Sequence, residues 1–488
     1  MDVEDRIRDA VREDRPEPSV QFNRRVMAGL PEHTSAAHRA IPTFPVFLRF
    51  AAVALVAIVA IGAVGLPMIL SKPDAAGPSS SANNGGLATS SLTSVSPSQA
   101  GPRGVPTVAP IVSHAPSRQF TVTGSPQYLY QNATLLNNGE VLVCGGYDDL
   151  AQRMLSEAAL YNPATGKFTP TGSLPEPRAG ATATRLLDGR VLIVGGSNAN
   201  YQQLGSAEIY DPATGKFTAT GSLKSPRQSH TATLLEDGRV LIAGGLAENP
   251  IASASSSDAI AMSYHASTDG RTRADGMTLE KGTLRSAEMY DPKTGQFSSA
   301  GSMTEARFDF AATLLTDGRV LIVGNASMDK PTDKSAELYN PKTGRFTRTG
   351  SMNVARMSEE LTVLKGGLVL VTDGALDGKS SEFYNPKTGK FTVTGSLNAP
   401  HGDYPATLLP DGRILLVGGT LMPGGNATSI AEAYDPKTGQ FTLVGYMNAA
   451  RDFATAVRLQ DGRVLIMGGT YAGPGGWVGI RSAELYTP

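Results

Sequence analysis

Cysteine is almost absent from this chain: Cys144 is the only one among 488 residues. A disulfide framework and a cysteine-based zinc site are therefore excluded. Net charge is also nearly absent, since 43 basic residues balance 44 acidic ones to leave −1. This balance removes the electrostatic argument for nucleic-acid binding. Charged residues make up only 18% of the chain, whereas glycine is abundant at 54 residues, a composition that favours an all-β protein with many tight turns.

Residues 50–70 form the longest apolar segment, with 21 residues and no charge. A helix of this length crosses a bilayer core of roughly 30 Å. Four arginines precede the segment between residues 24 and 49, and only Lys72 follows it closely. The positive-inside rule then predicts a single-pass signal anchor in the cell membrane, with a cytoplasmic tail over residues 1–49 and the rest of the chain extracytoplasmic. A cleaved signal peptide is the alternative, but the tail is long for one and no Ala-x-Ala site clearly follows.

Residues 71–117 are rich in Ser, Pro, Gly and Ala and have almost no aromatic side chains. Such a composition buries too little apolar surface to fold, so we expect a disordered linker. The remaining residues, 118–488, form a separate domain.

Seven similar units follow one another in residues 118–488. Each contains a glycine dipeptide between two apolar runs, which predicts a tight β-hairpin. The dipeptides begin at Asn138, Asp188, Asp237, Asp317, Gly366, Asp411 and Asp461. A third run ends in tyrosine, and a turn such as Asp211-Pro-Ala-Thr-Gly215 connects it to a fourth. Each unit therefore predicts a four-stranded antiparallel meander.

The hairpins recur every 49 or 50 residues in most cases, a period typical of β-propeller blades. The last unit ends at Tyr486 without a fourth strand. Residues 119–125, Gln-Phe-Thr-Val-Thr-Gly-Ser, carry the fourth-strand pattern ahead of the first unit. We therefore expect this N-terminal strand to pair with the strand ending at Tyr486 and complete a seventh blade. Closure of this kind removes open sheet edges.

The Asp-Gly-Arg-Val-Leu-Ile-Val-Gly-Gly and Tyr-Asp-Pro-x-Thr-Gly-x-Phe patterns resemble kelch repeats, most closely those of bacterial galactose-oxidase-like proteins. The resemblance covers about residues 118–488. It implies a seven-bladed kelch-type β-propeller but is weak for function.

The connection from each fourth strand to the next unit carries a recurring residue, ten positions before the hairpin dipeptide. The residues in this slot are Arg178, Arg227, Arg307, Arg356 and Arg451, with His401 and Tyr128 in the other two units. In a propeller these connections surround the mouth of the central channel. An arginine ring there predicts binding of anionic groups. The alternative interpretation is structural, with each arginine tying its connection to a neighbouring blade.

Two further places are candidates for ligand contact. The position three residues past the slot varies between units and includes His230, Glu359 and Tyr404, a variety that suits either a ligand-lined mouth or an unconstrained surface. Residues 246–285 form a long insertion, which suits either a binding role or a disordered decoration.

Copper oxidase chemistry of the galactose-oxidase-like group needs Tyr and His ligands. The only adjacent Tyr-His pair, Tyr264-His265, lies in the insertion. Cys144 sits in an apolar run and is expected to be a core residue rather than a reactive thiol. We therefore expect no catalytic residue, no metal and no cofactor.

The sequence favours a membrane-anchored extracytoplasmic module that binds protein or glycan without catalysis. One alternative is a transmembrane sensor with a cytoplasmic partner, because residues 22–31 resemble the cytoplasmic tails of bacterial anti-sigma-factor-like proteins, although their His/Cys zinc pattern is absent. The other is a galactose-oxidase-like copper oxidase.

Overall fold

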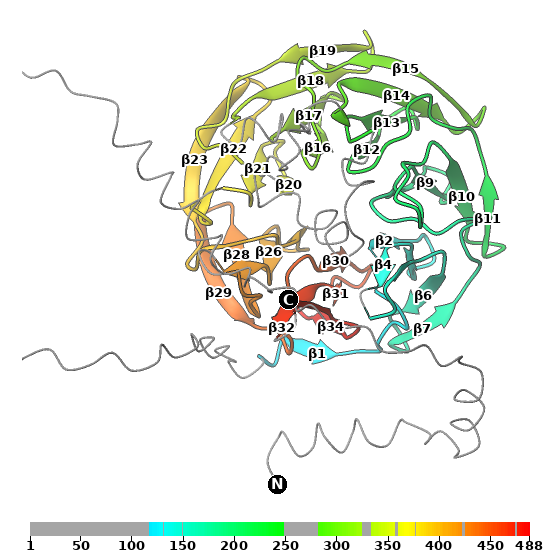
Figure 1. Ribbon diagram of the computed structural model, residues 1–488. Helices are drawn as coiled ribbons and strands as arrows, with labels where there is room; N and C mark the ends of the chain where they lie inside the picture. Colours follow the sequence, from blue (N-terminus) through cyan, green and yellow to red (C-terminus); the bar gives the residue numbers. More distant parts are fainter. Residues whose placement is uncertain are drawn as a thin grey trace, which may run out of the picture. The chain divides into compact units, whose positions relative to one another are not determined.

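The computed structural model describes residues 117–488, apart from 130, 149, 248–281, 325–332, 357–359, 376, 422–424 and 474–475. Its strands form seven four-stranded antiparallel sheets, arranged in a ring as the blades of a β-propeller (Figure 1). Within these described ranges no helix is both long and apolar enough to span a membrane. The predicted tail, membrane segment and linker, up to residue 116, lie outside them, as does most of the insertion.

Each blade runs outward from the central channel through four strands. The innermost strands are β2 (Asn132–Leu135), β8 (Thr182–Arg185), β12 (Thr231–Leu234), β16 (Ala311–Leu314), β20 (Glu360–Val363), β25 (Ala406–Leu408) and β30 (Thr455–Arg458). The second strands are β3 (Val141–Cys144), β9 (Val191–Val194), β13 (Val240–Ala243), β17 (Val320–Val323), β21 (Val369–Thr372), β26 (Ile414–Val417) and β31 (Val464–Met467).

The third strands are β6 (Ala158–Asn162), β10 (Ala207–Asp211), β14 (Ser286–Asp291), β18 (Ala336–Asn340), β22 (Ser380–Asn385), β28 (Ile430–Asp435) and β34 (Ala483–Tyr486). The outermost strands are β7 (Lys167–Pro170), β11 (Lys216–Ala219), β15 (Gln296–Ser302), β19 (Arg345–Arg348), β23 (Lys390–Ser396), β29 (Gln440–Tyr446) and β1 (Phe120–Val122). Three short ribbons stand beside the blades: β4 (Tyr147–Asp148) with β5 (Arg153–Met154), β24 (His401–Gly402) with β27 (Thr420–Leu421), and β32 (Thr470–Gly473) with β33 (Gly476–Gly479).

The Asp-Gly-Arg repeat builds the hairpin between the first two strands. In the second blade Gly189 takes φ +90°, a conformation that costs glycine little. The Asp188 carboxylate accepts a hydrogen bond from the backbone N–H of Arg190 at 3.0 Å and another from its guanidinium Nε at 2.8 Å. The aspartate therefore fixes the turn, and the exposed arginine neutralises its charge.

The second strands form the centre of the core, and all four residues of β9 are fully buried. Cys144 lies buried in β3, and this burial raises the pKa of its thiol to about 12. Blades are also joined by the third-strand tyrosines, whose hydroxyls bond a threonine of the preceding outer strand. The pairs are Thr123–Tyr161, Thr171–Tyr210, Thr220–Tyr290, Thr349–Tyr384 and Thr394–Tyr434, at 2.6–3.0 Å. Ala300 and Val444 replace the threonine at the other two seams.

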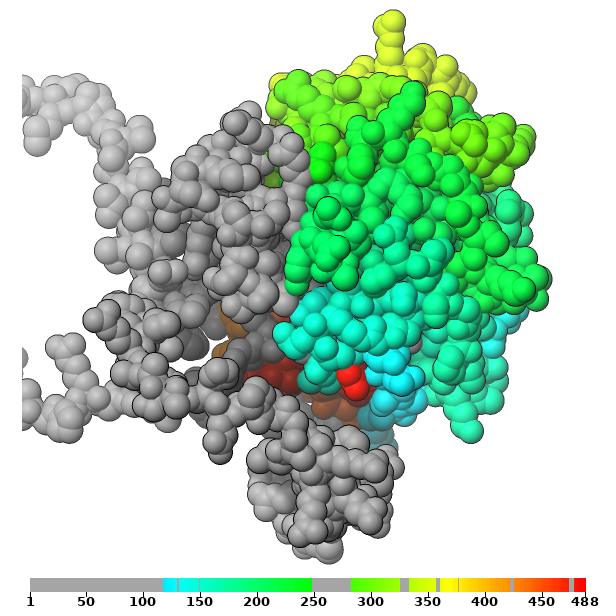
Figure 2. Space-filling view, turned by 45° about the vertical axis from the view of Figure 1, so that its right-hand side comes forward, coloured from blue at the N-terminus to red at the C-terminus, as the bar shows by residue number. Residues whose placement is uncertain are grey.

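The seventh blade is built from both ends of the propeller domain. Phe120 pairs with Tyr486 and Val122 with Glu484, so β1 becomes the outer neighbour of β34. The Phe120 and Tyr486 rings lie 5.0 Å apart, close to the 4.8 Å of the equivalent Tyr161–Phe168 pair. In both views the blue-cyan first strand lies beside the red C-terminal residues (Figures 1 and 2). The ring is thereby closed within residues 117–488.

The five arginines of the predicted ring are buried at the seams between blades, with at most 1% of each exposed. Each guanidinium bonds a carbonyl at the end of the second strand of the blade it leads into, as Arg451 bonds Gly468 at 2.8 Å. Each also faces a buried third-strand glutamate. The pairs are Arg178–Glu208, Arg227–Glu288, Arg307–Glu337, Arg356–Glu382 and Arg451–Glu484, at 2.6–3.5 Å.

The backbone of the same residue is bonded to the preceding blade. The carbonyl of Arg178 accepts the N–H of Gly146 at 2.8 Å, and the carbonyl of Arg451 accepts that of Gly419 at 2.8 Å. One residue therefore holds two blades together. The prediction of an anion-binding arginine ring does not match this geometry, because the charges are enclosed and already paired; the structural interpretation accounts for them.

The two slot residues that are not arginine, His401 and Tyr128, also contact the blade that they lead into. His401 is buried; its Nδ1 lies 2.7 Å from the carbonyl of Gly418, and its Nε2 lies 3.4 Å from Glu432. Tyr128 leads into the first blade, where Ala159 occupies the position of the glutamate. Tyr128 packs against the apolar cluster that contains Ala159. An apolar contact thus replaces the ion pair in that blade.

Replacing Arg451 by alanine should lower the free energy of unfolding by about 3–5 kcal/mol, because Glu484 would stay buried without its cation. The control is Arg413→Ala, which breaks an exposed pair with Asp411 and should cost less than about 1 kcal/mol. Urea unfolding of the two variants measures the difference. Equal effects would mean that the seam pair is not a major stabilising contact.

Phe120→Ala should destabilise the propeller by about 3 kcal/mol, because it removes a buried ring from the closing strand. Phe120 is 4% exposed, whereas Val122 on the same strand is 62% exposed. Val122→Ala is therefore the matched control and should change stability by less than about 0.5 kcal/mol. If thermal unfolding shows no difference between these variants, the closing strand does not carry stability.

Candidate functional site

The channel mouth is surrounded by residues that stand two positions past the arginine slot, just before each innermost strand. They adopt left-handed backbone conformations, with φ of +65° at Gly180, +51° at Ser229, +46° at Asp309, +57° at Asp403 and +48° at Phe453. Non-glycine residues in this region carry backbone strain of about 1 kcal/mol or more. Tyr130 and Ser358 occupy the other two positions and lie outside the described residues.

Backbone hydrogen bonds connect these residues from blade to blade. The N–H of Ser229 donates to the carbonyl of Gly180 at 3.4 Å, and the N–H of Asp309 donates to that of Ser229 at 3.2 Å. Further round, the N–H of Phe453 donates to the carbonyl of Asp403 at 3.1 Å. Each innermost strand also contacts the innermost strands of the neighbouring blades. The mouth is therefore a rigid rim, on which side chains are held at fixed positions.

Asp309 and Asp403 give this rim a pair of interacting carboxylates, and both side chains are half-buried. Burial raises the pKa of Asp309 to about 6, against a hydrogen bond from Ser229 that lowers it. Burial, together with the negative charges of Asp452 and Asp309, raises the pKa of Asp403 to about 6. No described Lys, Arg or His forms an ion pair with either of them. The two groups can therefore exchange protons or accept a ligand's cation near neutral pH.

Asp373 organises the seam beside Asp403. It replaces the first glycine of the pair that ends the second strand in other blades, such as Gly195, and keeps the left-handed φ at +65°. Its carboxylate accepts the N–H groups of Asp403 at 3.0 Å and Tyr404 at 3.1 Å. Burial, and then the charge of Asp403, raise the pKa of Asp373 well above its ordinary value. This seam is unlike any other in the ring.

Two more carboxyl groups lie near the same side of the mouth. Burial raises the pKa of Glu360, at the start of β20, to about 7, and its charge in turn raises that of Asp373. Asp452 is fully buried and accepts the hydroxyls of Thr470 and Thr420, so its role is to join the sixth and seventh blades. The mouth therefore concentrates carboxyl groups, whereas the sequence predicted a ring of arginines.

The other predicted ligand residues are placed as follows. His230 is 6% exposed, and its Nε2 lies 3.0 Å from the Thr182 hydroxyl. Burial and the charge of Arg227 lower the pKa of His230 to about 3, so the imidazole is neutral. Tyr404 is buried, and its hydroxyl accepts the N–H of Asp373 at 2.9 Å. Tyr128 is half-buried under the guanidinium of Arg153, 5.1 Å from its ring centre.

Glu359 lies outside the described residues, as does the Tyr264-His265 pair. The predicted site residues are thus not brought together as one ligand surface. The residues that sequence reasoning missed, Asp309 and Asp403, stand one position before Phe310 and Tyr404. Their signal was a column in which five of the seven residues are Gly, Ser or Asp, types that favour turns and left-handed conformations, with Tyr130 and Phe453 as the other two.

A copper centre of the galactose-oxidase type does not fit the side chains at the mouth. The His230, His401 and Tyr404 side chains are each bonded within blade seams, and although the His401 and Tyr404 rings pack 4.8 Å apart, the hydroxyl of Tyr404 bonds Asp373 and Nδ1 of His401 bonds Gly418. Cys144 is enclosed in the core. Across the described ranges, no group of three or more His, Cys, Asp or Glu side chains is arranged to hold a metal ion.

Comparison with known proteins agrees with the fold. The family model for the kelch motif matches residues 177–224 and 404–448. A solved structure of a fungal alcohol oxidase of the AA5 family, in complex with copper, is similar with a TM-score of 0.56 and 18% identity, over 76% of this chain and 75% of that one. At this identity the likeness concerns the fold alone. No curated protein matches the chain in sequence. With kelch motifs in residues 177–224 and 404–448 and seven four-stranded blades in its structure, the chain is a seven-bladed β-propeller that carries kelch motifs.

Proposed function

We propose that this protein is a membrane-anchored extracytoplasmic binding module, whose propeller captures a protein or glycan ligand at the channel mouth without catalysis. The observation that carries the proposal is the Asp309–Asp403 pair. Both carboxylates stand on a strained rim, partly open to solvent, and the nearby arginines are occupied in the seams.

The chemistry of the pair indicates what the ligand offers. Ionised carboxylates accept hydrogen bonds and attract cations, and charge-assisted bonds of this kind are the strong ones. Lysine or arginine side chains of a protein, or hydroxyl and amino groups of a glycan, supply such donors. An anionic ligand would be repelled by the same pair. The ligand proposed is therefore cationic or rich in hydroxyl groups, opposite in charge to the one that the arginine ring predicted.

The membrane anchor in this proposal rests on residues 50–70, which have the length and composition of a spanning helix. With the tail on the cytoplasmic side, the propeller would face its ligand outside the cell.

Replacing Asp309 and Asp403 together by asparagine should stabilise the propeller at pH 7.5 by roughly 2 kcal/mol, since it removes two ionised groups whose burial is unfavourable. Asparagine accepts the left-handed conformation, so the backbone is kept. Because the folded pKa values, about 6, lie above the unfolded value of 3.8, the native state holds more protons between these two pH values. Wild-type stability should therefore fall as pH rises from about 4 to 6, and the variant should show a shallower slope, because Glu360, Asp373 and Asp452 still titrate with raised pKa values.

Thermal unfolding across this pH range measures both effects. Asp237→Asn is the control, because Asp237 is exposed and paired with Arg239. A double variant that is less stable than wild type at pH 7.5 would show that the two carboxylates serve the fold.

A short oligolysine peptide should bind the full-length protein in detergent more tightly as pH rises through about 6, because Asp309 and Asp403 then ionise. The double asparagine variant should lose about tenfold or more in affinity at pH 7.5, the range of one or two charge-assisted bonds. Isothermal titration calorimetry gives the affinity, with Asp237→Asn as the control. Binding that ignores both pH and the double variant would rule out the mouth as the site.

A further inference from the structure

The face opposite the channel mouth carries the hairpin turns and the turns between third and fourth strands. Each turn between a third and a fourth strand begins with Asp or Asn, whose side-chain oxygen accepts the backbone N–H of the residue two positions later. The bond is 2.9 Å from Asp291 to Lys293 and 2.9 Å from Asn340 to Lys342. In the sixth blade Asp435 accepts the N–H of Lys437 in the same way as Asp291 accepts that of Lys293. Asn therefore builds the same turn as Asp but leaves the following lysine without a neighbouring negative charge.

The fourth and fifth blades are the two in which this turn combines Asn with lysine. Five exposed cations gather there, which we call the cationic sector: Lys342, Arg345, Lys365, Lys387 and Lys390. In the described part of the chain none of the five forms an ion pair. The fifth blade lacks both the hairpin aspartate and its arginine, since Gly366-Gly367-Leu368 replaces Asp-Gly-Arg, and Lys365 directly precedes this turn.

The other blades are close to neutral at this face. Lys293 and Lys437 follow aspartates in the third and sixth blades, and the first two blades carry Ala164 and Ala213 at the lysine position. Hairpin aspartates such as Asp461 are paired with their own arginines. The excess of positive charge is therefore confined to one sector.

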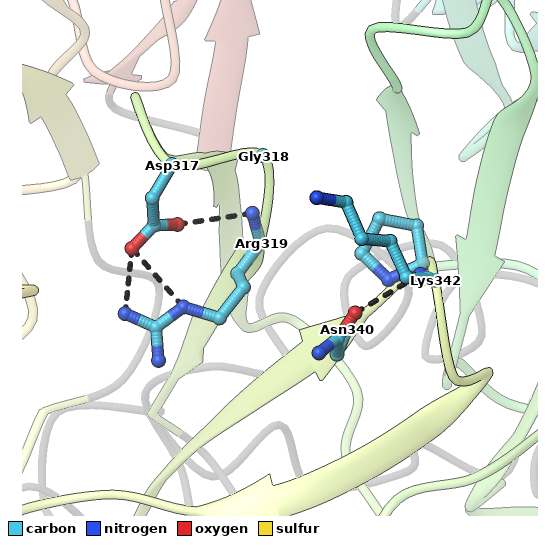
Figure 3. Close-up of a pocket in the computed structure, with 6 residues that line it drawn as sticks. Asp317, Gly318, Arg319, Asn340 and Lys342 are labelled. Carbon is cyan, nitrogen blue, oxygen red and sulfur yellow. Dashed lines mark hydrogen bonds and ion pairs between the residues drawn. The ribbon is translucent and has the colours of Figure 1, made fainter.

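Contacts place the two blades of the sector side by side. The Arg319 guanidinium donates to the carbonyl of Pro386, in the turn of the fifth blade, at 3.0 Å. A pocket between the two turns of the fourth blade is lined by Asp317, Gly318, Arg319, Asn340, Pro341 and Lys342. In Figure 3 the Arg319 guanidinium folds back onto Asp317, while Asn340 bonds the backbone of Lys342. The pocket thus has one neutralised cation and one free ammonium group.

We propose that the cationic sector docks on the anionic lipid surface of the membrane to which the protein is anchored, so that the channel mouth points away from it. This inference rests on the membrane anchoring in the proposed function. The propeller would face the outer leaflet, and where that leaflet contains anionic lipids each basic group at its surface is attracted by about 1 kcal/mol, as at other anionic lipid surfaces. The five charges lie on exposed turn tips across two blades and do not converge on one buried point, which suits an extended charged surface better than a single small anion.

The chain length before the propeller permits this contact. Residues 71–116 provide 46 residues between the apolar segment and the first described residue. A linker of that length, of the kind that the composition of residues 71–117 predicts, has a root-mean-square span of about 35–40 Å. Tethering at this distance keeps the local concentration of the sector near the lipid high, so weak electrostatic contacts are enough for docking.

The test uses the full chain in lipid nanodiscs, with energy transfer from one dye on the protein to an acceptor on lipid headgroups. Cys144 is buried and does not react, so a single introduced cysteine takes the dye. Thr388→Cys marks the exposed turn of the sector, and Asn200→Cys marks an exposed loop on the mouth face. Discs of phosphatidylcholine alone are compared with discs that also contain phosphatidylglycerol, at low and high salt.

Docking predicts higher transfer from the Thr388→Cys dye than from the Asn200→Cys dye, only in anionic discs at low salt. Asn340→Asp with Asn385→Asp keeps both turn bonds, adds two negative charges, and should lower the ratio of docked to free propeller by about thirtyfold. The matched control is Ala164→Asp with Ala213→Asp, which adds the same charge to the same face in the first two blades. It should leave docking nearly unchanged.

If the full chain incorporates into both kinds of disc but energy transfer from the two dyes is equal, the docking proposal is wrong while the membrane anchor is supported. Failure of the chain to incorporate into either disc overturns the anchor, and docking with it. If the Asn-to-Asp pair instead abolishes binding of an acidic polysaccharide while transfer stays indifferent to lipid charge, the sector's partner is that polysaccharide and the lipid proposal is wrong.

Discussion

The buried pair between a slot arginine and a third-strand glutamate is the contact on which the rest of this propeller depends. The arginine side chain bonds the next blade, while the backbone of the same arginine remains bonded to the previous blade. The rim residues of the channel mouth follow only two positions later. At the Arg307 seam the ion pair therefore sets the relative position of the blades and also fixes the carboxylate of Asp309, whereas His401 occupies the slot before Asp403. Removing one partner would leave a charge buried and unpaired. Neither the arginine nor the glutamate can therefore be replaced alone without destabilising the seam.

The two surfaces that we propose for binding lie where the repeat is broken. Asp373, His401 and Tyr404 depart from the common pattern together, at one seam, and hold Asp403 in its strained conformation. On the opposite face, Asn340 and Asn385 keep the turn and remove its negative charge. A chain with a net charge of −1 thus carries an acidic mouth and a basic sector at the two ends of its blades. The net charge is therefore near zero although one face carries a group of carboxyls and the opposite face a group of cations.

The fold was predictable from the sequence because turn chemistry is local. Asp-Gly and Pro-x-Thr-Gly fix their turns through positive φ and Asx bonds within a few residues. The arginine slot was harder, since recurrence shows that a residue is needed but not where its side chain points. A signal was nevertheless present: the blade with Tyr128 in the slot is also the blade with Ala159 in place of the glutamate. The acidity of the mouth could not be predicted, because it depends on burial and on carboxylates from different blades.

The central claim is that the Asp309–Asp403 rim is the ligand-binding surface. A glycan and peptide array probed with the full-length protein and with the Asp309→Asn/Asp403→Asn variant tests it most directly. The account predicts that wild type selects lysine- or arginine-rich peptides or glycans rich in hydroxyl and amino groups, and that the variant loses those signals while keeping its fold. Selection of anionic ligands, or signals that survive in the variant, would contradict it.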